Sequence, residues 1–340
     1  MFLSAASQRT QHIRLGHGIV QLPTNHPMRV AERASTLDIL SDGRLELGLG
    51  EGQLTLELEP FDATLEDKRG RFLEAVQALI PMFGDAPSEF HGQYYDLPPR
   101  NVVPKPVQKP HPPLWVACTK MNTIRDAGAW GMGVLGFQFA SAQQAETWIG
   151  AYYNEFLKRP APLADYRRNP NIAVASYFMC SPTDELALQR NEGASFFQFS
   201  LESYRSSFFD PEAPSLWERY RLWRETEKGQ KASNYTGGLI GSPDSLRNRL
   251  RKFERSNIDM VIFLVQTGKV AHEHVCESLE LFATQVMPEF HEREPDHQAW
   301  KQAVLAGEIE LLDPDTESTR VDGQQLPWEI KRRREAVSGG

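Results

Sequence analysis

Short apolar runs alternate with segments of helical periodicity from about residue 12 to residue 290. This alternation predicts six strands, each followed by a helix. The predicted strands are Ile13–Val20, Leu45–Leu49, Leu114–Ala117, Val134–Phe139, Ile172–Cys180 and Met260–Val265. Strands that alternate with helices in this way favour an α/β fold with a parallel sheet.

Helix starts are marked by local signals. Pro27, after Asn25 and His26, predicts a helix with proline in its first turn. Thr64 and Asp67 suit a capping box at the start of a second helix. Seven prolines between Pro98 and Pro113 exclude regular structure there and predict a rigid loop that leads into the third strand.

The length of 340 residues fits one parallel barrel, which commonly has about 250 residues, with additions. We expect a barrel domain over residues 1–290, a mostly helical insert at 184–232 and a polar extension at 291–340. The insert is rich in aromatic residues, which would either cap an apolar substrate pocket or pack the insert itself. These residues are Phe196, Phe197, Phe199, Tyr204, Phe208, Phe209, Trp217, Tyr220 and Trp223.

Composition and charge exclude several classes of protein. With 45 acidic and 37 basic residues, the net charge of −8 argues against nucleic acid as a partner. No apolar run reaches the roughly 18 to 20 residues that span a bilayer, and the first residues do not resemble a signal peptide. Cys118, Cys180 and Cys276 form neither a disulfide framework nor a CxxC metal site, so we expect a cytoplasmic protein.

Three predicted strand ends carry candidate functional residues, because parallel barrels place their sites at the carboxyl ends of strands. The first is Gly16-His17-Gly18-Ile19, and the second is Gly48-Leu49-Gly50-Glu51-Gly52, where glycine permits close backbone approach. The third, Cys118-Thr119-Lys120 through Thr123, puts hydroxyls and a lysine at a helix N-terminus, which favours anions.

Each of these segments also has a structural explanation. Glycines at strand ends are often only tight turns, His17 fits a core histidine, and Lys120 fits an exposed helix start. The spacing of Gly48, Gly50 and Gly52 is not that of a dinucleotide-binding motif. His272 and Cys276 could share a helix face, but the sequence offers no third ligand, so we expect no metal.

The segment from Leu22 to Gly52 matches the pattern LPTNHPxRxAExxxTLDxLSxGRxxxGxGxG. In this pattern the chain resembles the luciferase-like, flavin-dependent monooxygenases of bacteria. Later stretches at 104–110, 113–117 and 281–288 agree, so the resemblance covers about residues 10 to 290. It implies a (β/α)8 TIM barrel, of which this chain has about six βα units; the family's first two units would lie upstream of Met1.

The resemblance implies a site for reduced FMN, or for the deazaflavin F420 in some branches, at the carboxyl ends of the strands. Gly18 and Ile19 match a position where a cis peptide supports the flavin ring. Gly50, Glu51 and Gly52 match the segment beside the flavin, whereas Cys118, Thr119, Lys120 and Thr123 match the phosphate-binding helix start. His17 is the candidate catalytic residue.

One departure from the family concerns charge. Luciferases have an arginine for the phosphate at the position of Glu51, and a carboxylate there repels phosphate unless it serves the ring or the substrate. The hypothesis is that Lys120 and Thr123 hold the phosphate.

The resemblance leaves three functions open. The first is a monooxygenase that uses reduced FMN and O₂ on a small organic substrate, with a flavin reductase as supplier. The second is an F420-dependent oxidoreductase, and the third is a non-catalytic luciferase-like subunit or fragment. A homodimer is expected, without nucleic acid or membrane as partner.

Overall fold

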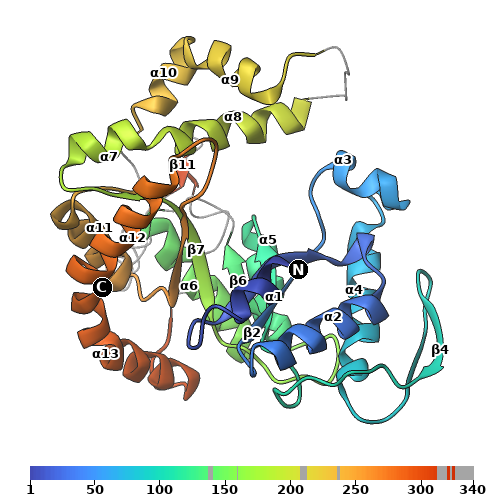
Figure 1. Cartoon of the computed structure of the whole chain (residues 1–340). Helices are drawn as coiled ribbons and strands as arrows, with labels where there is room; N and C mark the ends of the chain where they lie inside the picture. The colour runs from blue at the N-terminus through green and yellow to red at the C-terminus, as the bar shows by residue number, and fades with distance from the viewer. Residues whose placement is uncertain are drawn as a thin grey trace. The chain divides into compact units, whose positions relative to one another are not determined.

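The computed structural model describes residues 1–136, 141–158, 160–206, 213–235 and 238–311, with the short strands at 320–321 and 324–325. The chain divides into two compact units, each treated separately below. Unit 1 comprises Met1–Phe137 and Ala151–Ala173, and unit 2 comprises Gln138–Gly150 and Val174–Gly340. Figure 1 shows the elements by label.

The sheet of unit 1 is parallel. It contains β1 (Leu15–Gln21), β2 (Leu45–Gly50), β5 (Leu114–Cys118) and β6 (Gly133–Gly136), in that order. Four predicted strands are therefore present, although residues 137–139 of the fourth lie outside the described residues. The β1–β2 register shifts between His17 and Val20, at the glycine-containing strand end.

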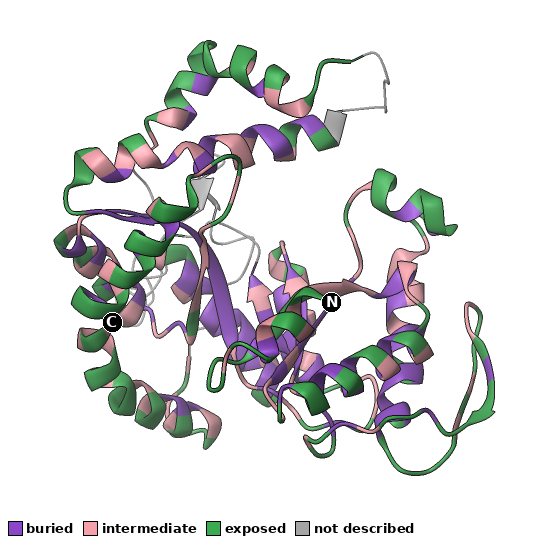
Figure 2. Cartoon of the chain, viewed as in Figure 1, coloured by how far each residue is buried: buried purple, intermediate pink, exposed green. Residues whose placement is uncertain are grey.

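Helices with apolar inner faces accompany these strands. They are α1 (Phe2–Ser7), α2 (Pro27–Leu40), α3 (Thr55–Leu58), α4 (Lys68–Leu79), α5 (Met121–Trp130) and α6 (Ala142–Lys158), the last with residues in both units. Short 3₁₀ turns lie at Leu22–Thr24, Glu59–Phe61 and Ile80–Phe83. Figure 2 shows buried residues on the strands and on one side of α2 and α4, as helical periodicity predicts.

The prediction for the second helix was partly right. Thr64 and Asp67 exchange the expected capping-box hydrogen bonds, with N–O distances of 2.8 and 3.1 Å between each backbone N–H and the other's side chain. The α-helix begins only at Lys68.

The prediction for the proline-rich segment was wrong at its start. Pro98 and Pro99 belong to strand β4 (Asp96–Arg100), which pairs only with β3 (Ser88–His91) in a two-stranded antiparallel hairpin. An isolated hairpin tolerates proline because an outer edge needs no N–H donor. Farther along, buried Asp38 accepts hydrogen bonds from the backbone N–H and the side-chain amide of Gln108, which fix the loop.

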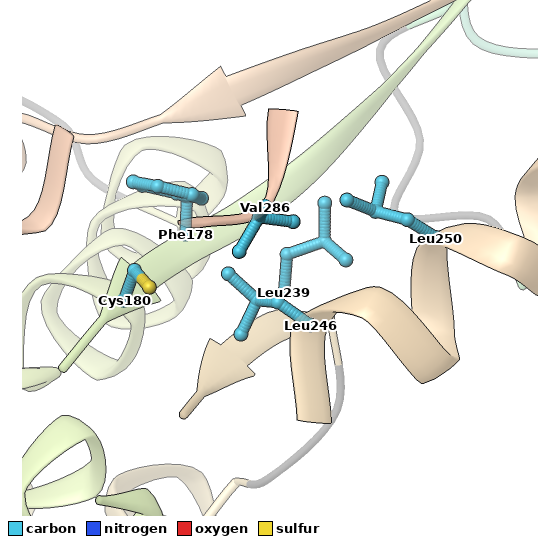
Figure 3. Close-up of a cluster of buried hydrophobic side chains, with 6 residues drawn as sticks. All are labelled: Phe178, Cys180, Leu239, Leu246, Leu250 and Val286. Carbon is cyan, nitrogen blue, oxygen red and sulfur yellow. The ribbon is translucent and has the colours of Figure 1, made fainter. Parts of the chain in front are cut away.

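In unit 2, β7 (Ile172–Cys180) pairs in parallel with β8 (Leu239–Gly241) and also pairs with β9 (Met260–Leu264). Strand β8 was not predicted, because three residues are too few to show a period. Helices α11 (Pro243–Arg255) and α12 (His272–Gln285) follow β8 and β9. Their apolar faces meet the sheet in a core of Phe178, Cys180, Leu239, Leu246, Leu250 and Val286 (Figure 3).

Within the region 184–232, the described residues are mostly helical, as predicted; residues 207–212 lie outside the described residues. The helices are α7 (Asp184–Arg190), α8 (Glu192–Ser206), α9 (Leu216–Arg224) and α10 (Glu227–Ser233). Five of its aromatic residues pack on one another between α8 and α9, which supports the packing role for them. These are Phe196, Phe199, Trp217, Tyr220 and Trp223. Phe197 instead lies against Tyr177 of β7, Tyr204 is exposed, and Phe208 and Phe209 lie outside the described residues.

The C-terminal part of unit 2 begins with α13 (Met287–Leu305), which runs past residue 291, where the polar extension was expected to start. A two-stranded hairpin of β10 (Arg320–Val321) and β11 (Gln324–Gln325) follows. Among the described residues, no helix is both long enough and apolar enough to cross a membrane.

Replacing Gly48 by alanine should destabilise unit 1, because the new Cβ would overlap the backbone carbonyl oxygen of His17. Backbone cannot move aside as a flexible side chain can, so we expect the free energy of unfolding to fall by about 1–3 kcal/mol. The matched control is Gly16→Ala, whose Cβ would meet nothing nearer than Glu46 Cβ at 3.5 Å. Urea unfolding followed by circular dichroism measures both, and equal losses would contradict the account.

Candidate active site

The carboxyl ends of β1, β2 and β5 lie side by side, because the three strands are parallel neighbours. At Gly50, residues from all three strand ends come close together. A Cβ at Gly50 would overlap Ile19 Cδ1 and would lie 3.6 Å from Ala117 Cβ. The same face of β2 carries Gly48, so two successive positions on that face lack a side chain. Both glycines are buried, and His17, Leu135 and Ile19 fill the space that their side chains would take, so the strand ends pack closely here.

The peptide bond between Gly18 and Ile19 is cis, as the family resemblance implies. His17, just before it, is exposed on the sheet edge. Partial desolvation of the ring and the nearby N-terminal ammonium group lower the pKa of His17, which favours the neutral imidazole at neutral pH. A neutral imidazole can accept a proton, but the catalytic role of His17 stays a prediction.

Glu51 does not pair with Lys120. Its carboxylate accepts a hydrogen bond from Arg69 at 2.5 Å and lies 3.8 Å from the ammonium group of Lys68. Arg69 also binds Asp126 at 2.7 Å and stacks over the Trp130 ring, 4.7 Å from its centroid. The carboxylate of Glu51 is therefore compensated by two cations from the start of α4.

The loop after β2 is tied to both neighbouring strand ends. Gly52 has a positive φ of 80°, and a Cβ there would overlap the side-chain amide of Gln21 at the end of β1. The carbonyl of Gly52 accepts a hydrogen bond from Lys68 at 2.6 Å. On the other side, the amide of Gln53 donates to the hydroxyl of Thr119 at 3.0 Å. These contacts hold Glu51, Gly52 and Thr119 in one fixed rim.

The start of α5 has the expected polar groups in an unexpected arrangement. Lys120 is the N-cap residue, and the hydroxyl of Thr123 donates to its carbonyl at 2.8 Å. The side chain of Lys120 is exposed and forms no ion pair with any described acid. The structure thus gives no fixed direction to the ammonium group of Lys120. This weakens the hypothesis that Lys120 holds a phosphate. It also leaves Lys120 as the uncompensated cation of the rim.

Cys118 lies behind this rim rather than on it. Its thiol is fully buried and donates weakly to the carbonyl of Thr123 at 3.3 Å. Burial raises the pKa of Cys118 to about 12, so the thiol stays protonated at neutral pH. Cys118 therefore packs behind the site and lacks the character of a nucleophile.

Thiol labelling should distinguish the three cysteines. Burial also raises the pKa of Cys180 to about 11, whereas Cys276 is exposed. Since only a thiolate reacts with iodoacetamide, we expect one modified cysteine, Cys276, in the folded protein at about pH 8, and three in urea. Mass spectrometry of the labelled peptides measures this, and rapid native labelling of Cys118 would refute its assignment as a buried packing residue.

Sequence reasoning found the strand-end glycines but missed the side chains that organise the rim. Lys68, Arg69 and Gln53 carry no motif, and the ion pair of Arg69 with Glu51 joins residues 18 apart in the chain. The polarity of α4 at its first turn was the only available signal. Away from the rim, His272 Nε2 lies 3.5 Å from Cys276 Sγ, and no group of three metal-ligating side chains occurs in the part of the chain that the structure describes.

Comparison with known proteins places this geometry in a family. A model of luciferase-like monooxygenases matches residues 1–260. The chain is 36% identical over 134 residues to an uncharacterized protein, y4wF, of Sinorhizobium fredii, but spans only 39% of that protein. It is 25% identical over 306 residues to the oxygenase component of the flavin-dependent trigonelline monooxygenase of Acinetobacter baylyi, covering 87% of this chain and 82% of the relative.

Solved structures share the fold at low sequence identity. The monooxygenase RslO1 of Streptomyces bottropensis superposes with a TM-score of 0.68 at 24% identity, over 85% of this chain and 82% of that one. The oxygenating constituent of 3,6-diketocamphane monooxygenase from Pseudomonas putida, solved with FMN, gives 0.62 at 18% identity, over 84% and 82%. The F420-dependent tetrahydromethanopterin reductase of Methanopyrus kandleri gives 0.60 at 18% identity, over 85% and 86%.

These neighbours confirm the predicted α/β fold of the luciferase-like TIM-barrel type. The family match covers more than half of the chain and includes all three strand ends of the candidate site. The chain therefore belongs to the luciferase-like monooxygenase family.

Proposed function

We propose that the protein is a flavin-dependent monooxygenase that uses reduced FMN and O₂ to oxygenate a small organic substrate. The observation that carries this proposal is that Ile19, Gly50 and Ala117 lie together at the carboxyl ends of three parallel strands, where parallel barrels place their sites. The flavin-dependent trigonelline monooxygenase, which this chain resembles over most of its length, supports the class of reaction.

The residues at the strand ends fit a flavin ring. A flat ring system needs an apolar surface, which the half-buried side chains of Ile19 and Ala117 at the strand ends would provide. When bound, reduced flavin supplies the electrons that activate O₂. The protein's part is to position the ring on Ile19 and Ala117, to exclude water and to keep the loops after β2 and β5 fixed through the Gln53–Thr119 hydrogen bond.

Compensation of Glu51 removes the repulsion that the sequence suggested between this carboxylate and the phosphate of FMN. Because Arg69 and Lys68 compensate Glu51, the carboxylate no longer opposes an anion. The start of α5 then offers backbone N–H groups and the ammonium group of Lys120. In this proposal Glu51 is a positioning residue, which holds the first turn of α4 against the rim.

F420 is the alternative cofactor, with hydride transfer in place of oxygen activation. The structural likeness to an F420-dependent reductase is the observation that favours it. A non-catalytic subunit is a further alternative, which the compact strand-end surface and the compensated rim do not favour. A flavin reductase as supplier of reduced FMN, and a homodimer, belong to the proposal as well.

Titration with the two cofactors tests the proposal. We expect reduced FMN to bind with a Kd in the micromolar range or below, more tightly than reduced F420, and reoxidation in air to be altered by the protein. Anaerobic fluorescence titration and stopped-flow absorbance measure these quantities. Tighter binding of F420 would transfer the protein to the alternative class, and binding of neither cofactor would favour the non-catalytic subunit.

Replacing Lys120 by alanine tests the assignment of the phosphate end. If its ammonium group contacts the phosphate, FMN binding should weaken by about 1.5–3 kcal/mol, the range of charge-assisted hydrogen bonds. Riboflavin, which lacks the phosphate, should lose little affinity. Lys252→Ala, on the exposed side of α11, serves as control. Equal losses for FMN and riboflavin would show that Lys120 acts through the fold instead.

A further inference from the structure

A concave surface lies at the opposite, amino-terminal ends of strands in unit 1. It is a cavity of about 460 Å³ that involves residues just before or at the start of β1, β2, β5 and β7. Its polar lining includes Arg14, Glu46, Lys109, His111, Arg167 and Arg168. None of these residues belongs to the rim around Glu51 and Lys120, so the cavity is separate from the proposed flavin site.

The cavity is strongly basic in a chain whose net charge is −8. Its single carboxylate, Glu46, is already satisfied, because it pairs with Arg14 and accepts a hydrogen bond from the indole N–H of Trp115 at 2.6 Å. Three cationic residues remain, namely Lys109, Arg167 and Arg168, and none of them forms an ion pair within the described ranges. Three uncompensated charges in one concavity repel one another unless an anion joins them.

The backbone that carries Arg167 is fixed by a buried histidine. The backbone N–H of Arg167 donates to Nε2 of buried His111 at 3.1 Å, while Nδ1 of that ring donates to the carbonyl of Pro112 at 2.7 Å. The contact at Nε2 requires the neutral imidazole, because a protonated Nε2 cannot accept a hydrogen bond, and burial lowers the pKa of His111 in agreement with this. The ring therefore fixes the backbone at Arg167.

Arg168 is fixed as well. Its guanidinium stacks on the Phe156 ring, 3.6 Å from the centroid, and donates to the carbonyl of the same residue. Its Nε is buried and has no hydrogen-bond partner. On the other wall, Arg14 donates to the side-chain carbonyl of Gln108 at 3.1 Å, next to Lys109. Of the three cations, Arg168 is therefore held by contacts of its own side chain, whereas the exposed side chains of Arg167 and Lys109 stay available to an anion.

The geometry points to a binding site at the amino-terminal ends of these strands for a small phosphate-bearing anion with two or more negative charges. The charge surplus matches a diphosphate, since arginine and lysine donors suit phosphate oxygens. The volume exceeds that of inorganic pyrophosphate and falls in the range of small-ligand pockets, so a nucleoside diphosphate also fits the cavity. This site does not depend on the proposed function.

Calorimetry with inorganic pyrophosphate on the full chain tests the site. We expect binding that weakens with added salt, and a loss of affinity of at least about tenfold in Lys109→Ser/Arg167→Ser. Lys252→Ser is the matched control for loss of a surface charge and should bind as the unchanged chain does. Circular dichroism and FMN affinity of the double variant should be unchanged, which separates this site from the flavin site.

ADP in place of pyrophosphate distinguishes the two sources of the phosphate. Tighter binding of ADP than of pyrophosphate would identify the ligand as a nucleotide. Equal binding would show that only the phosphates are recognised, and both results support the site. Absence of pyrophosphate binding in the unchanged chain would overturn the inference. Displacement of pyrophosphate by FMN would also overturn it, because it would place the anion at the proposed flavin site. So would full affinity in the double variant, because Lys109 and Arg167 would then not hold the anion.

Discussion

The close approach of β1 to β2 is the constraint on which the rest of unit 1 depends. The carbonyl of His17 occupies the space that a Cβ at Gly48 would need, and the Ile19 side chain occupies the space beside Gly50. Because β2 has glycine at these two positions, β1 can approach closely enough for the β1–β2 register to shift between His17 and Val20. The same two glycines let the strand ends pack closely, and the candidate site lies at those ends, so packing and the candidate site share one cause.

Charge is distributed differently at the two ends of these strands. At the carboxyl ends, Glu51 is neutralised by Arg69 and Lys68, and the half-buried side chains of Ile19 and Ala117 lie at the same strand ends. At the amino ends, Glu46 is neutralised by Arg14, and further cations remain uncompensated around it. A compensated rim favours a large, mostly apolar cofactor with one anionic end. An uncompensated cavity favours a small anion of high charge density.

The sequence predicted what depends on period and on local chemistry. Strands such as β2 and β7 and helices such as α11 follow from apolar spacing, and the glycine-rich strand ends pointed to the site. Strand β8 was not predicted because three residues show no period. Strand β4 was not predicted because proline was taken to exclude a strand. The pair of Arg69 with Glu51 could not be predicted, because it depends on how α4 packs and not on local spacing.

Hydrogen exchange with and without reduced FMN tests the central claim, that the flavin lies at the carboxyl ends of β1, β2 and β5. Mass spectrometry of peptides resolves the two ends of the strands. The account predicts slower exchange on FMN binding in peptides covering residues 16–21, 48–53 and 117–123, with no change at 107–113 or 167–171. Protection confined to other segments, or protection at the amino-terminal ends, would contradict it.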